Sequence, residues 1–238
     1  MRLAAILLAP TLALLAPAPA LAQAYQCAPP ARFAPVRPMR PDGPVIRAPI
    51  ARYTLALSWS PEFCRSQRGQ GGANAFQCSG ASGRFGFVLH GLWPESSSGP
   101  APQWCALTPR PSPQTLRQNL CMTPSPWLLE HEWAKHGSCM AKRPEDYFRV
   151  AGILWQSLRF PEMDQLSRRE DLTAGDLRRA FVAANRGWTP KAVGIMSGSR
   201  GWLRELKLCY GRDFLPEACP RRSFGPPDSA PLKIWRGS

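Results

Sequence analysis

Acidic residues and histidines are scarce in this 238-residue sequence. It has 16 Asp and Glu against 30 Lys and Arg, so its formal net charge is +14, and it has only three histidines. With 44% hydrophobic and 10% aromatic residues the chain can bury a core, which excludes global disorder. Its length fits one domain, or at most two small ones. The charge points to a polyanionic partner: nucleic acid, an anionic surface or an acidic substrate.

Several short motifs are also missing. No Cys-x-x-Cys occurs, which argues against zinc knuckles and ribbons. No Gly-x-Ser-x-Gly occurs, which argues against a serine nucleophile of the hydrolase type. Beyond residue 22 no stretch is apolar enough to cross a bilayer, and no internal repeat is visible.

Residues 1–22 have the composition of a secretory signal. Arg2 supplies the charged start, an apolar run follows, and Ala20-Leu21-Ala22 is an A-x-A cleavage site. A membrane anchor is the alternative, but the run is short and is interrupted by proline. We therefore expect a periplasmic or secreted mature protein without a membrane span.

Export would place the eight cysteines in an oxidising compartment, where disulfides are expected. A thiolate metal site is the alternative, which the missing Cys-x-x-Cys disfavours. Eight cysteines allow on the order of a hundred pairings. Two pairs that are close in the sequence are candidates, Cys64–Cys78 and Cys209–Cys219.

Two segments rich in Pro and Arg flank the predicted domain at 51–220. Residues 23–50 are interpreted as an arm or linker, and residues 221–238 as a C-terminal tail. For the arm we favour a solvated tether. An ordered wrap over the domain, held by Cys27, stays open.

Hydrophobic periodicity within the domain indicates both strands and helices. Ser125-Pro126 is typical of a helix start, and Thr173 with Asp176 resembles a capping box. Because the elements show no βαβ rhythm, the pattern favours the α+β class. The predicted elements are strands at 53–59, 84–89 and 202–210, and helices at 126–136, 148–158 and from 173.

All three histidines fall inside two short motifs. HGLWP at 90–94 directly follows a predicted strand, and HEWAKHG at 131–137 lies on a predicted helix. Because residues four apart share a helix face, the carboxylate of Glu132 lies with the imidazole of His136. Two imidazoles, a carboxylate and an ammonium are thereby concentrated within one and a half turns. The tryptophans of these motifs, Trp93 and Trp133, could instead be core residues.

The spacing of the second motif disfavours a metal site. A zincin needs His-Glu-x-x-His, with the two histidines four residues apart. Here His131 and His136 are five apart, about 140° around the helix, and a third ligand would have to come from His90. A metal-dependent phosphodiesterase remains an alternative that sensitivity to EDTA would support.

Without a metal or cofactor, these groups can perform acid–base chemistry on a phosphate. One imidazole can remove a proton while another donates one, and Lys135 with a protonated histidine can stabilise charge on phosphoryl oxygens. RNA carries its own nucleophile, the 2′-hydroxyl, whereas DNA lacks it and should be spared. RNA is therefore the predicted substrate. A non-catalytic RNA-binding protein is disfavoured, because it would not need the whole set of groups.

The two motifs resemble the two catalytic segments of the ribonuclease T2 family. Both are nearly complete, in the right order and about forty residues apart, and YTLALSWSPEFC at 53–64 is similar to the family's first strand and the cysteine after it. The resemblance covers roughly 50–220. It implies an α+β fold with a central antiparallel sheet, flanking helices and disulfides. It also implies a metal-independent endoribonuclease, expected to be a monomer, that cuts single-stranded RNA by transphosphorylation to a 2′,3′-cyclic phosphate with low base specificity.

The resemblance also implies roles for the residues of the two motifs. His136 would be the general base on the 2′-hydroxyl, and His90 the acid that protonates the 5′-oxygen, with the two roles reversed in a later hydrolysis step. His131 would hold the phosphate. Glu132 and Lys135 would polarise it and stabilise the pentacovalent state.

Base recognition is implied less clearly. Trp93 would stack on a base. Glu95 stands where the family often has Asp or Asn, which leaves base preference open. Leu128-Leu129 stand where the family often has aromatic residues, which weakens a stacking subsite for a second base.

The cysteines left open by spacing are also addressed by the resemblance. It implies a bridge between Cys139 and a cysteine after the first motif, for which Cys105 is the better candidate. Cys27 and Cys121 are then left over, and their pairing is a conjecture.

Overall fold

The centre of the molecule is a four-stranded antiparallel sheet. The computed structural model describes residues 24–25, 27–67, 74–107 and 109–237. Its strands are β1 (Ala24–Tyr25), β2 (Arg52–Trp59), β3 (Arg84–Phe85), β4 (Phe87–Glu95), β5 (Val193–Ser197) and β6 (Leu203–Tyr210). The central sheet has the order β4-β2-β6-β5, and β1 pairs with β3 in a separate short ribbon. The predicted α+β architecture is confirmed.

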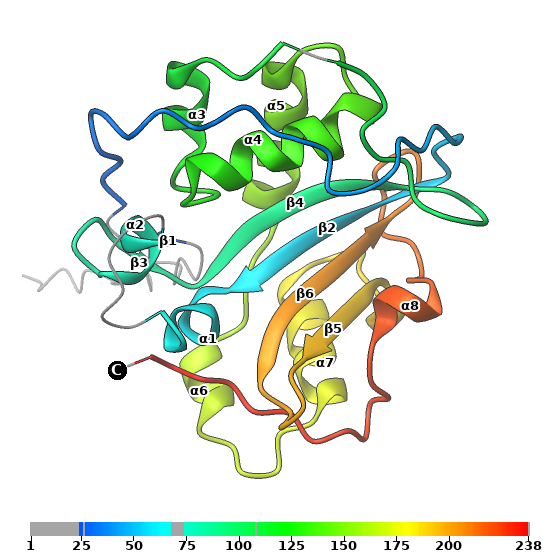
Figure 1. Cartoon of the computed structure of the whole chain (residues 1–238). Helices are drawn as coiled ribbons and strands as arrows, with labels where there is room; N and C mark the ends of the chain where they lie inside the picture. Colours follow the sequence, from blue (N-terminus) through cyan, green and yellow to red (C-terminus); the bar gives the residue numbers. More distant parts are fainter. Residues whose placement is uncertain (1–23, 26, 68–73, 108, 238) are drawn as a thin grey trace, which may run out of the picture.

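Helices flank this sheet (Figure 1). They are α1 (Ser60–Arg65), α2 (Ala75–Cys78), α3 (Pro113–Asn119), α4 (Pro126–Lys135), α5 (Pro144–Ser157), α6 (Met163–Ser167), α7 (Ala174–Ala184) and α8 (Arg221–Phe224), with 3-10 turns at Gly137–Cys139 and Pro190–Ala192. α3, α4 and α5 gather beside β4, whereas α7 lies behind β5. Every predicted strand and helix has a counterpart. The strand predicted at 84–89 is divided into β3 and β4, and β4 continues through the HGLWP motif, which was predicted to follow the strand. The elements that were not predicted are β1, β5, α1, α2, α3, α6 and α8.

Two helix starts follow the predicted capping chemistry. The Ser125 hydroxyl accepts a hydrogen bond from the Leu128 amide at the start of α4. At α7, Thr173 and Asp176 form a reciprocal capping box. These caps satisfy amides that have no partner within the helix, so they fix where each helix begins.

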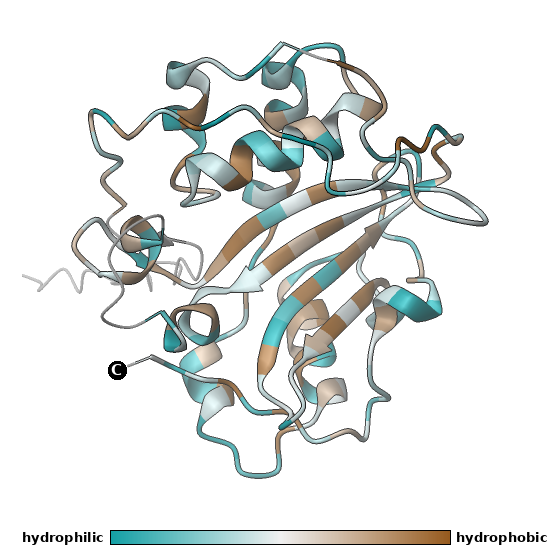
Figure 2. Cartoon of the chain, in the orientation of Figure 1, coloured by the Kyte–Doolittle hydropathy of each residue, from teal (hydrophilic) through white to brown (hydrophobic). Residues whose placement is uncertain are grey.

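The two faces of the sheet differ in polarity. On β6, Leu206 and Leu208 are buried in the core, whereas the alternating residues Glu205 and Lys207 belong to the opposite face. Figure 2 shows the same alternation along this strand. The polar face is therefore available for a site, and the apolar face packs against the helices.

A β-bulge interrupts the pairing of β4 with β2. The register passes from Leu57 opposite Leu89 to Ala56 opposite Gly91, which leaves His90 without a partner on β2. Bulges redirect a side chain and increase the local twist. The first histidine is therefore placed by an irregularity of the sheet.

The N-terminal arm lies along the domain surface, so the solvated tether is wrong for its described part. The Arg110 guanidinium donates to the Val36 carbonyl at 2.6 Å, Ile46 pairs with Gln103, and the Arg47 guanidinium donates to the Cys105 carbonyl at 2.8 Å. Figure 1 shows this segment running past α3 and α4. The ordered wrap describes it better.

The C-terminal tail is also part of the folded domain. Leu232 and Ile234 are core residues, 3% and 5% exposed, and the Trp59 indole donates to the Trp235 carbonyl at 2.6 Å. The predicted boundary at 220 is therefore wrong. The boundary was misplaced because prolines and arginines surround Leu232 and Ile234 in the sequence and mask their apolar pattern.

All four predicted disulfides are present. They join Cys27 to Cys121, Cys64 to Cys78, Cys105 to Cys139, and Cys209 to Cys219. The predicted secretory signal, 1–22, lies outside the described residues. No helix in the described ranges is long and apolar enough to cross a membrane.

Candidate active site

His90 is held between two carboxylates. Its Nδ1 lies 2.7 Å from Oε1 of Glu205 on β6, and its Nε2 lies 3.7 Å from Oε1 of Glu132 on α4. Hydrogen bonds from His90 and Ser58 and the charges of His90 and Lys207 outweigh burial and lower the pKa of Glu205. An ionised carboxylate only accepts hydrogen bonds, so Nδ1 carries the proton in this pair.

The second motif spans the end of α4. His131, Glu132 and Lys135 lie on the helix, and His136 follows its last residue. The Glu132 carboxylate is 4% exposed and accepts a hydrogen bond from the Trp93 indole at 2.7 Å. The helix therefore brings the second motif against the strand that carries the first.

Gly91 makes this approach possible. A Cβ atom at this position would lie 2.0 Å from Oε2 of Glu132 and 2.6 Å from Nε1 of Trp93. No larger residue fits there without displacing one of these groups. The glycine of the HGLWP motif is thus required by the contact between β4 and α4.

Trp93 lies between the imidazoles of the two motifs. Its ring centroid is 5.1 Å from that of His90 and 5.6 Å from that of His136. The Lys207 ammonium lies 5.3 Å from the same indole centroid. Trp133, in contrast, is buried in the core and donates to the Pro109 carbonyl. Trp133 is therefore a core residue, whereas Trp93 lies beside the imidazoles of the two motifs.

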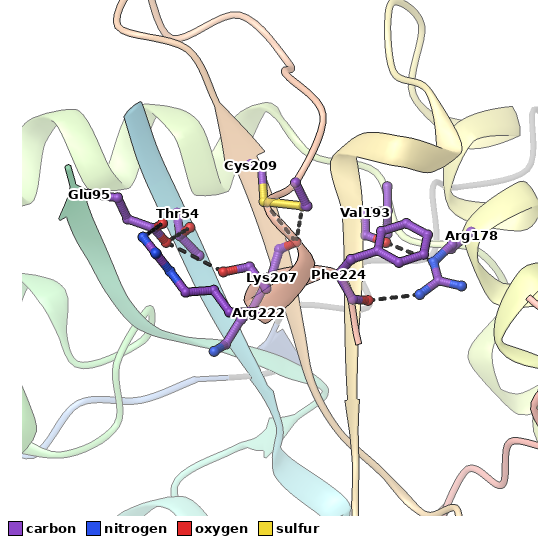
Figure 3. Close-up of a disulfide and its surroundings, with 10 residues drawn as sticks. Thr54, Glu95, Arg178, Val193, Lys207, Cys209, Arg222 and Phe224 are labelled. Carbon is purple, nitrogen blue, oxygen red and sulfur yellow. Dashed lines mark hydrogen bonds and ion pairs between the residues drawn. A yellow bond between two sulfur atoms is a disulfide. The ribbon is translucent and has the colours of Figure 1, made fainter. Parts of the chain in front are cut away.

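Glu95 points into protein contacts. Its side chain is buried, accepts a hydrogen bond from the Thr54 hydroxyl, and pairs with the Arg222 guanidinium at 2.8 Å. Figure 3 shows Thr54 and Arg222 directed at this carboxylate. The structure does not bring Glu95 together with the three histidines by any contact among the described residues.

His131 lies between two tryptophans that the sequence had not singled out. Its ring stacks on Trp127, with centroids 5.0 Å apart, and meets Trp104 edge-on at 5.6 Å. Trp127 is 52% exposed. The aromatic surface beside the second motif is thus supplied by Trp127, one position before Leu128-Leu129.

Asp42 of the arm reaches the same place. Its Oδ2 lies 2.9 Å from the Lys135 ammonium and 3.7 Å from His131 Nε2, and its Oδ1 accepts a hydrogen bond from the Trp104 indole at 3.1 Å. A carboxylate from the arm therefore contacts two of the predicted site residues.

The environments shift the pKa values of His90 and His136 in opposite directions. Burial and the positive charges of Lys135, His131 and His90 lower the pKa of His136 to about 3. Burial also opposes charge on His90, but the hydrogen bond to Glu205 and the negative charges of Glu132 and Glu205 raise its pKa overall. The environment of His136 therefore favours the neutral imidazole, and that of His90 favours the protonated one.

Burial also shifts the pKa values of Glu132 and His131. Burial raises the pKa of Glu132 to about 7, although the charge of His90 and the bond from Trp93 act against it. Burial, partly offset by Asp42, lowers the pKa of His131. In the absence of substrate, the environment of His131 thus favours its neutral form.

Five predicted residues are thus brought together: His90, His131, Glu132, Lys135 and His136. Within the part of the chain that the structure describes, no group of three or more His, Cys, Asp and Glu side chains is placed to hold a metal ion. The arrangement offers a proton acceptor, a proton donor, an ammonium and a buried carboxylate around one small region. The sequence profile of the Ribonuclease T2 family matches residues 51–169.

The chain belongs to the ribonuclease T2 family. Among curated proteins it is similar to a "Probable ribonuclease" of Haemophilus influenzae, 39% identical over 199 residues that cover 76% of this chain and 66% of that protein. It is also similar to "Ribonuclease I" of Escherichia coli, 26% identical over 215 residues that cover 74% and 80% of the two chains. The match to the Haemophilus protein thus spans about two thirds of its length.

Solved structures of similar fold include known ribonuclease T2-like chains. Trichomaglin, described as an S-like ribonuclease, superposes with a TM-score of 0.61 at 22% identity, over 78% of this chain and 97% of its own. An RNase-related protein from Calystegia sepium gives a TM-score of 0.61 at 21% identity, over 79% and 98%. At these identities the likeness concerns the fold alone.

Four residues at the site were missed by sequence reasoning: Asp42, Trp104, Trp127 and Glu205. Strand alternation at 202–210 did contain a signal, since it places Glu205 and Lys207 on one polar face. Which strand that face would meet depends on the sheet order. Nothing in the sequence around Asp42 indicates a contact with the site, because the Pro- and Arg-rich composition of the arm is typical of a tether.

Proposed function

We propose that this chain is an endoribonuclease that cleaves single-stranded RNA by transphosphorylation to a 2′,3′-cyclic phosphate, without a metal and with low base specificity. The observation that carries the proposal is the placement of His90 and His136 on either side of Trp93, with two carboxylates beside His90. The pKa values of the two imidazoles shift in opposite directions, which supports a base and an acid within one site. Family membership and the net positive charge support the same substrate class.

In the first step, the neutral imidazole of His136 removes the proton from the 2′-hydroxyl. The 2′-oxygen then forms a bond to phosphorus while the bond from phosphorus to the 5′-oxygen breaks. His90, as the imidazolium, gives its Nε2 proton to the departing 5′-oxygen. One proton is taken up and one released, so the step balances, and the exchanged states of the two histidines are those that hydrolysis of the cyclic phosphate needs.

The other three groups act on the phosphoryl oxygens. Lys135 supplies a full positive charge, and His131 donates a hydrogen bond whose strength grows as the charge of the phosphate raises the pKa of its imidazole. Glu132 is buried beside Trp93 with a pKa of about 7, so it can share a proton with a phosphoryl oxygen. Charge that develops in the pentacovalent state is thereby stabilised.

Location and assembly follow the same reasoning. We propose that the mature protein is a periplasmic or secreted monomer released from a signal at 1–22. Four disulfides support an oxidising compartment. DNA should be spared, because it has no 2′-hydroxyl for His136 to activate.

The test is digestion of RNA by the purified mature protein in excess EDTA, with analysis of the product ends. We expect 2′,3′-cyclic phosphate ends on RNA and no cleavage of a DNA of the same sequence. An RNA with a single 2′-deoxy position should resist cleavage at that linkage only. Activity that needs a divalent metal, or cleavage at the 2′-deoxy position, would contradict the proposal.

A further inference from the structure

Glu205 has no role in the five-residue set, yet it makes the shortest polar contact to His90. Its Oε1 lies 2.7 Å from Nδ1 and also accepts a hydrogen bond from the Ser58 hydroxyl at 3.0 Å. Ser58 and Glu205 are paired across β2 and β6. The carboxylate is therefore fixed by two neighbouring strands before it meets the imidazole.

We infer that Glu205 is a positioning residue that holds the His90 ring by Nδ1, so that Nε2 is the atom that delivers the proton. The inference rests on the proposed function, since it concerns the acid of that reaction. A carboxylate on one ring nitrogen fixes the tautomer and the orientation of the imidazole. Because His90 lies in a β-bulge, the regular backbone pairing with β2 does not fix it.

The charges around His90 show why this contact matters. Glu205 and Lys207 face it from β6, and Glu132 faces it from α4. The positive charge of His90 in turn lowers the pKa values of His131 and His136 of the second motif. Removal of the Glu205 charge would leave Lys207 opposed by Glu132 alone, and Glu132 itself has a pKa of about 7. The pKa of His90 should then fall.

The test compares Glu205→Gln and Glu205→Asp with the control Glu170→Gln, which changes an exposed carboxylate that makes none of these contacts. In E205Q the basic limb of the kcat/KM profile should move to lower pH by about half to one pH unit, with kcat lowered about tenfold and KM little changed. E205D should recover part of both effects. E170Q should match the unaltered protein.

A purely structural role gives a different result. It would lower activity equally at all pH values, with a lower Tm and no displacement of the limb, and that outcome would overturn the inference. The titration of the His90 imidazole by NMR gives a reading that does not depend on catalysis. An unchanged His90 titration in E205Q would reject the role of Glu205 even if the protein proved not to cleave RNA.

A second, independent observation concerns the arm. Asp42 lies in a short stretch between two anchors, the contact of Val36 with Arg110 and the contact of Pro44 with Gln103. Of the described contacts made by residues between these anchors, only those of the Asp42 carboxylate reach the site. Its side chain remains 50% exposed.

The Asp42 carboxylate contacts two of the groups that the proposed reaction uses for phosphate, Lys135 and His131. Its oxygens meet the Lys135 ammonium, His131 Nε2 and the Trp104 indole. Trp104 is held in place with φ +54°, a conformation that a bulky residue rarely adopts, and its amide donates to the Lys135 carbonyl at 2.7 Å. Two carboxylate oxygens thus accept hydrogen bonds from the Lys135 ammonium and the Trp104 indole, with His131 Nε2 3.7 Å away, an arrangement that would equally suit two phosphoryl oxygens.

We propose that the arm is a tethered competitor, in which Asp42 and the substrate phosphate exclude each other at Lys135 and His131. This inference also rests on the proposed function. Because the ion pair is half exposed, a phosphodiester of the same charge can displace it at modest cost, and a phosphate monoester, which carries more charge, can do so more readily. The apparent affinity for a phosphate ligand is then reduced by the fraction of molecules in which the arm is seated.

The test measures binding of inorganic phosphate and adenosine 3′-monophosphate by calorimetry to the full mature chain. Asp42→Asn should tighten binding of both by about two- to fivefold and lower KM for RNA by a similar factor. The control Asp146→Asn removes the same charge from an exposed pair with Arg143 and Arg149. It should change neither quantity by as much.

The other outcomes contradict the competitor. Weaker phosphate binding in D42N would mean that Asp42 positions Lys135 for the ligand. Equal gains in D42N and D146N would mean that only net charge matters. Calorimetry measures the binding of both ligands and needs no catalysis. A protein that failed to cleave RNA would therefore overturn the proposed function but leave this test of Asp42 valid.

Discussion

The two histidines with opposite pKa shifts, His90 and His136, occupy contrasting environments. His90 lies in a bulge of β4 with a carboxylate on Nδ1 and a second carboxylate near Nε2. His136 follows the last residue of α4, and its buried Nδ1 has no hydrogen-bond partner among the described residues. Its neighbours Lys135, His131 and His90 all disfavour its positive charge. The contrast teaches that burial and charged partners, and not residue type, set the direction in which each imidazole pKa shifts.

The largest effect is expected when either member of the pair is removed. His90→Ala and His136→Ala should each lower kcat/KM by about 10²–10⁴-fold, because each loses a proton-transfer group. The double variant should be little worse than the single ones, because the two act as a unit. RNA binding, measured by fluorescence anisotropy with a non-cleavable 2′-deoxy analogue, should persist. Full cleavage by either single variant would refute the pair.

The next effect concerns the cation beside the phosphate. Lys135→Gln should lower kcat by about 10²–10³-fold, since it removes the charge that stabilises the phosphoryl oxygens. Lys142→Gln is the matched control, because Lys142 is exposed and lies outside the site. Steady-state kinetics on a dinucleotide substrate would measure both. Equal, small changes in the two variants would show that Lys135 contributes only to net charge.

A smaller effect should follow when the contact between the two motifs is opened. Gly91→Ala would place Cβ 2.0 Å from the Glu132 carboxylate, so the carboxylate or Trp93 must move. We expect kcat/KM to fall at least about tenfold and the free energy of unfolding to fall by about 1–3 kcal/mol. Gly152→Ala in α5 meets its nearest atom at 3.9 Å and should leave activity intact. Activity assays and thermal unfolding of both variants would decide.

The mildest test leaves the sequence untouched and varies pH. Activity requires a neutral His136, whose pKa is lowered, and a protonated His90, whose pKa is raised. The acid limb of the profile should therefore lie below the ordinary histidine pKa of about 6.5, and the basic limb above it. Measurement of kcat/KM from pH 3 to 9 would show both limbs. A profile with only one limb, or with both limbs on the same side of pH 6.5, would contradict the opposite pKa shifts of the two histidines.

Much of the site was predictable because its signals are local. The helix α4, its Ser125 cap and the positions of Glu132 and His136 follow from residues a few places apart. Closeness in the sequence similarly favoured two of the four disulfides, Cys64–Cys78 and Cys209–Cys219. Family resemblance added the meeting of the two motifs and the bridge from Cys105 to Cys139.

What could not be predicted depends on contacts between distant segments. The bulge at His90 arises from its pairing with β2, and the approach of Glu205 arises from the order of strands in the sheet. The arm and the tail are proline-rich, which is typical of linkers, yet anchors far along the chain order them. Composition alone cannot distinguish a linker from an ordered wrap of this kind.

The most direct test of the acid–base assignment is an NMR titration of the imidazole rings in the folded protein. With only three histidines in the sequence, three ring signals are expected, and single substitutions would assign them. We predict that the His90 ring titrates above pH 6.5 and the His136 ring below it. The reverse order, or two rings that titrate together, would contradict the account.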